Sequence, residues 1–327
     1  MTYRNLSQLG AVALFTVAVV SAQTKAGWKI PRTPDGHPDL EGIWSNATRT
    51  PVERVPEFAG KPTLSDAEAK AWERKDAQNW QELDGTSEGP LHATKGSTGT
   101  GAYNVLFYDM GSELARVDGV KRTSMVIDPP DGRIPPATDA AKVRRAAAPN
   151  GTNFDSVKDR PLTERCLVGS TTGPPMLPVL YNNNYQIVQT ADAIMIQNEM
   201  IHDTRIIRIN AQHAPAGVSQ WFGDSIGRWE GDTLVVETTN FNDVTRFRGS
   251  SRNLKVTERF TRADANSILY KATVEDPATW TKPWTVELPF MAAPGPIYEY
   301  ACHEGNYAIE DILGGLRRTE AAASRDK

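Results

Sequence analysis

His202 lies in a polar group, residues 198–205, that interrupts two isoleucine-rich segments of strand character. Ionisable groups bracketed by apolar flanks lose solvation, and the pKa shifts that follow are those that general acid/base catalysis needs. Strand alternation places His202 on one face with Asn198, and Glu199, Asp203 and Arg205 on the other. We interpret this group as a candidate site for proton transfer. The alternative is a surface turn in which Asp203 pairs with Arg205 while His202 packs as a neutral side chain.

A second candidate is the segment YEYACHEGN, residues 298–306, in which His303 shares a strand face with Glu299. The imidazole and the carboxylate could meet one substrate, which Tyr300 would contact, or one metal ion. Two histidines from different strands and a carboxylate would suit zinc or iron. The separation of His202 from His303 carries no metal signature, so a divalent metal is one possibility and the cofactor stays undetermined.

Glu258 shares a strand face with Val256 and Phe260, and a buried carboxylate is unfavourable unless it is paired. Neighbours in one strand point to opposite faces, so the partner must come from across the sheet, and Arg205 or His202 are candidates. We therefore include Glu258, like Glu199, as a possible partner of His202 in proton transfer. The alternative is an exposed, charged sheet face without a function.

Trp280 and Trp284 are close together in the sequence and could stack on a sugar or an aromatic ring. The alternative is that these side chains close the end of a barrel. No phosphate-binding glycine loop, no nucleophile elbow and no HExxH motif is present. The sequence therefore does not define a reaction class.

The amino terminus predicts export. Residues 1–22 combine Arg4, an apolar core of about a dozen residues and a small-residue end, which are the parts of a signal peptide. No later segment reaches the roughly 18 consecutive apolar residues of a membrane span, so we expect none after cleavage. In a periplasmic or secreted protein, Cys166 and Cys302 are expected to form one disulfide. Two free thiols, or a nucleophilic thiol at Cys302, are the alternatives.

The charge pattern bears on partners. The net charge of −4 is made of interspersed acidic and basic residues, which gives no reason to expect a nucleic-acid partner. A small-molecule ligand or substrate is the expected partner, and the oligomeric state is open.

The second half of the chain predicts a mainly β fold. Short β-branched and aromatic runs are separated by hairpin-length turns, including two Gly-Asp turns at Gly223 and Gly231. Sequential strands with short connections favour an antiparallel up-and-down barrel or clamp, similar to a lipocalin, around a cavity. The expected strands are residues 185–190, 193–198, 204–209, 233–239, 254–262, 267–274, 284–290 and 297–303.

The first half predicts long loops and one or two helices. Ser65 and Glu68 form a capping box at the start of a helix over residues 67–80, and residues 139–148 form a second helical segment. The Pro-rich residues 150–180 are expected to be an ordered loop across the barrel mouth. We divide a single structural domain into a signal peptide (1–22), an irregular region packed on the barrel (23–180), the barrel core (181–307) and an exposed tail (308–327).

Five segments resemble a large group of exported, functionally uncharacterised proteins of acidobacteria and proteobacteria. They are PDLEGIW (38–44), GPPMLP (173–178), YNNNYQIVQT (181–190), GDTLVV (231–236) and YEYACHEGN (298–306). The resemblance covers nearly all of the chain after the signal peptide, and it implies no activity.

Two hypotheses of function follow. In the first, the protein is an exported lyase, isomerase or hydrolase that uses a histidine and a carboxylate for proton transfer on a small, partly apolar molecule. In the second, it is a periplasmic binding protein that holds such a molecule without catalysis. The first requires His202 and His303 to converge inside the barrel, whereas the second requires only a cavity. A structural or surface role is a third possibility.

Overall fold

The computed structural model describes residues 28–83, 108–147, 153–169, 173–215, 217–244 and 247–325. The signal peptide expected at residues 1–22 lies outside this part of the chain.

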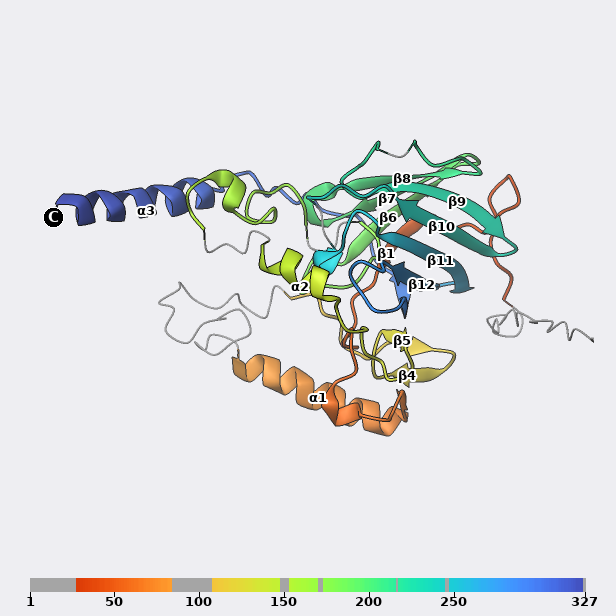
Figure 1. Cartoon of the computed structure of the whole chain (residues 1–327). Helices are drawn as coiled ribbons and strands as arrows, with labels where there is room; N and C mark the ends of the chain where they lie inside the picture. The colour runs from red at the N-terminus through yellow and green to blue at the C-terminus, as the bar shows by residue number, and fades with distance from the viewer. Residues whose placement is uncertain are drawn as a thin grey trace, which may run out of the picture.

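Among the described residues, nine strands close into a barrel (Figure 1). They are β1 (Gly42–Ser45), β6 (Asn184–Gln189), β7 (Ala193–Asn198), β8 (Thr204–Ile209), β9 (Asp224–Glu230), β10 (Thr233–Thr239), β11 (Lys255–Asp264), β12 (Ser267–Glu275) and β13 (Trp284–Ala292). The barrel closes because β1 pairs with β6 on one side and with β13 on the other. The predicted mainly β, antiparallel barrel is confirmed.

One strand pair departs from the up-and-down pattern. β8 and β9 run parallel, with Ile207 opposite Ser225. A parallel pair needs a crossover connection rather than a tight turn. β9 therefore begins at the same end of the barrel as β8, and the described residues 210–215 and 217–223 belong to the connection between the two strands.

The strand predicted at residues 297–303 does not form. Residues 297–301 have no regular structure, and residues 302–305 form a turn. The positions beside β13 are occupied by β12 and β1, and the short strand β5 (Val126–Asp128) adds to the same strand. That prediction is therefore wrong, because a distant strand from the first half of the chain closes the barrel.

The barrel interior is a packed core. Side chains alternate between buried and less buried positions along most of β11 and β12. Phe260, Tyr270, Trp284, Leu288 and Phe290 have no exposed surface, and the rings of Tyr270 and Phe290 lie 4.9 Å apart. The expected central cavity is thus filled with side chains, and space for a ligand must lie elsewhere.

The remaining elements surround the barrel. Helix α1 (Asp66–Leu83) lies against a three-stranded sheet of β2 (Thr63–Leu64), β3 (Arg116–Val117) and β4 (Val120–Arg122). The predicted capping box starts α1, since the Ser65 backbone N–H and hydroxyl both donate to the Glu68 carboxylate, at 2.9 and 2.7 Å. Helix α2 (Asp139–Ala146) is capped by Thr138, whose hydroxyl accepts from the Ala141 N–H. Short 3-10 helices are η1 (Pro56–Phe58), η3 (Val157–Asp159), η4 (Met200–His202) and η5 (Phe247–Gly249).

The carboxy-terminal residues form helix α3 (Ala308–Arg325), which extends away from the barrel in Figure 1. Of its side chains only Leu313 is buried. In the described part of the chain, no helix has the length and apolar character that crossing a membrane requires.

Candidate functional site

The described pockets gather at one end of the barrel, which we call the barrel mouth. Here β7 and β10 end, and β8 and β11 begin. The pockets are lined by residues from these strand ends, including Asp203, Phe222 and Phe241, and by residues 173–180. Residues 173–180 of the predicted Pro-rich loop thus lie at the barrel mouth.

Residues 173–178 form a plug in the barrel mouth. Met176 is 2% exposed and belongs to the core of the barrel. Its backbone N–H donates to the Tyr270 hydroxyl at 2.8 Å, and its carbonyl accepts from the Asn46 side-chain amide at 3.1 Å. The Arg205 guanidinium also contacts its sulfur at 3.3 Å. These contacts fix the plug as a rigid wall.

Below the plug, Arg205 and Glu258 form a buried ion pair. The Arg205 guanidinium donates to both carboxylate oxygens of Glu258, to Oε1 at 3.0 Å, and the Tyr270 hydroxyl donates to Oε1 at 2.9 Å. Burial alone would lower the pKa of Arg205, but the adjacent carboxylate raises it above its usual value. Glu258 has 0% exposure and Arg205 8%. Arg205 is one of the two partners that the sequence suggested for Glu258, the other being His202. Because the ion pair is buried, it suits a structural role in stabilising the core and the plug.

The structure places His202 outside the barrel. The residue ends η4, is exposed, and has a positive φ, as does Ile201. The backbone turn breaks the strand alternation on which its inward orientation depended, so that expectation is wrong. Glu199 precedes the turn, is buried, and accepts from the Asn184 amide at 2.8 Å. Asp203 follows the turn at the rim, where it lines one very small pocket and a second pocket of about 690 Å³.

The second candidate group also lies outside the barrel wall. His303 is exposed in the turn that replaces the expected strand, and Glu299 precedes it in irregular chain. Tyr300 interacts with the Tyr181 hydroxyl, and burial together with this contact raises the pKa of Tyr181. In the described part of the chain, no contact joins His303 to His202. The structure therefore does not assemble the expected pair of imidazoles in the barrel interior.

Two expected ligand contacts are buried. Trp284 has no exposed surface and packs with Phe247 and Trp280 at the mouth, as expected for a side chain that closes a barrel end. Asn198 is 4% exposed at the end of β7. Among the described residues, no three histidine, cysteine, aspartate or glutamate side chains are arranged to hold a metal ion.

One pocket formed by the described residues has a volume of about 810 Å³, and we call it the mouth pocket. Its apolar lining includes Leu177 of the plug and the side chains of Trp221, Phe222, Phe241 and Phe247. Its cationic lining comes from α2, from residues 158–165 and from η5. The cationic side chains are Arg144, Arg145, Lys158, Arg160, Arg165 and Arg248.

Most of these cations have no salt bridge. Arg160 is paired with Glu164 at 2.7 Å, and Arg144 donates to the Thr279 hydroxyl at 2.7 Å. Within the described ranges, Lys158, Arg165 and Arg248 pair with no carboxylate at salt-bridge distance, and neither does Arg145. Burial of its charged group and the neighbouring Arg145 guanidinium lower the pKa of Arg248, and the Glu53 carboxylate offsets part of this effect. The pocket therefore carries positive charge that an anion would neutralise.

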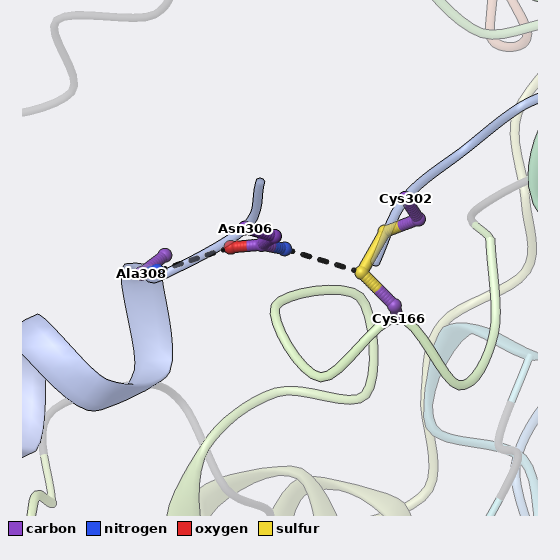
Figure 2. Close-up of a disulfide and its surroundings, with 4 residues drawn as sticks. All are labelled: Cys166, Cys302, Asn306 and Ala308. Carbon is purple, nitrogen blue, oxygen red and sulfur yellow. Dashed lines mark hydrogen bonds between the residues drawn. A yellow bond between two sulfur atoms is a disulfide. The ribbon is translucent and has the colours of Figure 1, made fainter. Parts of the chain in front are cut away.

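The predicted disulfide between Cys166 and Cys302 is confirmed (Figure 2). Cys166 follows directly on Arg165 of the pocket wall, and its sulfur accepts from the Asn306 amide at 3.3 Å. The bond ties this wall to the chain that leads into α3. It leaves no free thiol for the alternative of a nucleophilic Cys302.

Sequence reasoning missed two features of this structure. The mouth-pocket cations had a signal, which is the density of Arg and Lys over residues 142–165 in and around the Pro-rich loop. His213 had none, because its partners are distant in sequence: Nδ1 lies 3.0 Å from Asp224, and Nε2 lies 3.3 Å from Glu237. This cluster pins the crossover connection to the barrel wall, and it lies outside the lining of the pockets.

Comparison with known proteins gives no match: no family model, no curated protein and no solved structure matches this chain.

Proposed function

We propose that this chain is an exported binding protein that holds a small amphipathic anion in the mouth pocket. The ligand has an apolar or aromatic body and one negatively charged group, which is a carboxylate, sulfate or phosphate. The observation that carries this proposal is that cations without salt bridges and aromatic side chains line one cavity. The expected signal peptide and the disulfide support export.

The lining matches both parts of such a ligand. Guanidinium groups form charge-assisted, bidentate hydrogen bonds with carboxylate, sulfate and phosphate oxygens, and Arg165 and Arg248 have no salt bridge in the described structure. The rings of Phe222, Phe241 and Phe247 offer apolar contact area for the ligand body. The volume of about 810 Å³ lies in the range of small-molecule sites.

The same lining argues against proton transfer in this pocket. Among the described residues of the lining there is no histidine, and the one carboxylate, Asp243, is paired with Arg252. Binding without catalysis therefore fits the mouth pocket better than the His-carboxylate mechanism.

The test uses anilinonaphthalene sulfonate, a fluorescent anion with an aromatic body, titrated into the mature protein. The variant Arg165→Ala/Arg248→Ala removes two cations from the pocket. Each charged hydrogen bond contributes about 1.5–3 kcal/mol, so we expect affinity to fall by at least about tenfold. Added salt should also weaken binding to the native protein.

Arg74→Ala is the matched control, because Arg74 is an exposed arginine on α1, outside the mouth pocket. This variant should bind the probe as the native protein does. Circular dichroism of each variant establishes that the fold is retained. Equal affinity of the double variant, Arg74→Ala and native protein would refute the proposal.

A further inference from the structure

A second cavity lies between α1 and the plug. Its volume is about 700 Å³, and we call it the α1 pocket. It shares Val52, Pro178 and Val179 with the mouth pocket, so residues 178–179 separate the two cavities. Figure 1 shows α1 on one side of the barrel, apart from β8 and β9 on the other.

Aromatic and methionine side chains dominate the α1 pocket. Its lining includes Trp72 and Trp80 from α1, together with Met110, Met125 and Met200. Methionine is flexible and polarizable, and it makes favourable contacts with aromatic rings. A planar aromatic molecule would therefore find rings and sulfur atoms along its faces.

The two tryptophan rings are held in position. The Trp72 indole N–H donates to Glu57 at 3.2 Å, and its ring packs on Phe58 with centroids 5.4 Å apart. Trp80 makes an edge-to-face contact with Tyr108, with centroids 5.5 Å apart. A ligand that stacks on these rings would not have to order them, which favours binding.

Polar groups around the α1 pocket are already satisfied. The Arg49 guanidinium donates to Asp76 at 2.7 Å and to the Gly111 carbonyl at 2.9 Å. The Thr48 hydroxyl donates to the Glu113 carbonyl at 3.0 Å. Because Arg49, the one cation among the described lining residues, is paired with Asp76, their one carboxylate, a charged ligand would lose hydration and gain no counter-ion.

We infer that the α1 pocket is a second ligand site, selective for neutral, planar aromatic molecules. It differs from the mouth pocket in charge rather than in size. The inference rests on the lining of the α1 pocket alone and does not depend on the proposed function of the mouth pocket.

The experiment compares N-phenylnaphthylamine, which is neutral, with the anilinonaphthalene sulfonate probe, which adds a sulfonate to a closely related skeleton. Both are titrated into the full mature protein. We expect saturable binding of the neutral probe that is weakened at least about fivefold by Trp80→Ala, since stacking on an aromatic ring is lost. The matched control is Trp221→Ala, which removes an exposed tryptophan of the mouth pocket and should leave neutral-probe affinity unchanged.

Asp76→Asn is a second variant that keeps the cavity but frees Arg49 from its counter-ion. It should create binding of the anionic probe that persists in an Arg165→Ala/Arg248→Ala background. Absence of saturable neutral-probe binding would overturn the inference, as would equal effects of Trp80→Ala and Trp221→Ala. Either result leaves the sulfonate titration of the mouth pocket as an independent outcome.

Discussion

The ion pair between Arg205 and Glu258 predicts strong, non-additive effects of substitution. Arg205→Met leaves the Glu258 carboxylate at 0% exposure with the Tyr270 hydroxyl as its donor. Glu258→Gln leaves the guanidinium without a carboxylate at 8% exposure. Breaking a buried pair on one side costs about 3–5 kcal/mol, because an uncompensated charge stays in the core. Each single variant should lose this much free energy of unfolding.

The double variant Arg205→Met/Glu258→Gln removes both charges and keeps an acceptor for Tyr270. Replacing a buried pair as a whole is often neutral, so we expect the double variant within about 2 kcal/mol of the native protein. Urea unfolding followed by tryptophan fluorescence measures all four proteins, and the cycle gives the coupling energy. A loss of less than about 1 kcal/mol in free energy of unfolding for each single variant, as for an exposed ion pair, would contradict this prediction. So would a double variant whose loss equals the sum of the two single losses.

Three further predictions concern the disulfide, the turns and the helix cap. Replacing Cys166 and Cys302 with serine removes a cross-link between residues 136 apart, and should lower the free energy of unfolding by up to about 5 kcal/mol in urea titrations. Gly223→Ala should lower the free energy of unfolding by about 3 kcal/mol, since at φ +74° the added Cβ would lie 2.6 Å from a backbone oxygen. Gly231 has φ +60° but open space around it, so Gly231→Ala should cost about 1 kcal/mol. Equal losses of the two variants in unfolding titrations would contradict this. Hydrogen bonds from Lys61 and Ser65 lower the pKa of Glu68 from 4.5 to about 2. The ionised Glu68 side chain therefore stabilises the α1 cap above pH 4.5, and this stabilisation is lost as the pH falls through about 2. The difference in helical circular dichroism between the Glu68→Gln variant and the native protein should disappear over the same pH range.

Local patterns in the sequence predicted those strands whose partners are their neighbours in the chain. β10, β11 and β12 contain β-branched residues, β11 alternates in burial along nearly its whole length, and a two-residue turn joins β11 to β12. β9 escaped prediction because Asp224–Glu230 contains a single β-branched residue. The pairing of Trp44 with Tyr185, which helps to close the barrel, joins positions far apart in the chain, and no local pattern specifies it.

The candidate site was harder to predict because its residue types carry no periodic signal. Burial logic correctly required a partner for Glu258 from across the sheet, and Arg205 is that partner. The face assignment of His202 failed because it assumed an unbroken strand, whereas Ile201 adopts a positive φ that β-branched residues rarely take. The cations of the mouth pocket come from three separate segments, and only the tertiary fold brings them together.

The buried polar network connects core stability to the sites. Tyr270 donates to Glu258 and accepts from the Met176 N–H, and Arg205 contacts the Met176 sulfur. A purely apolar core could be as stable, but it would leave the backbone of the plug without these partners. Pro178 and Val179, at and beside the end of the plug, line both pockets, so a shift of Met176 would move a wall of each. The double variant that restores stability should therefore still bind both probes more weakly than native protein. Unchanged affinities would mean that the ion pair serves the core alone.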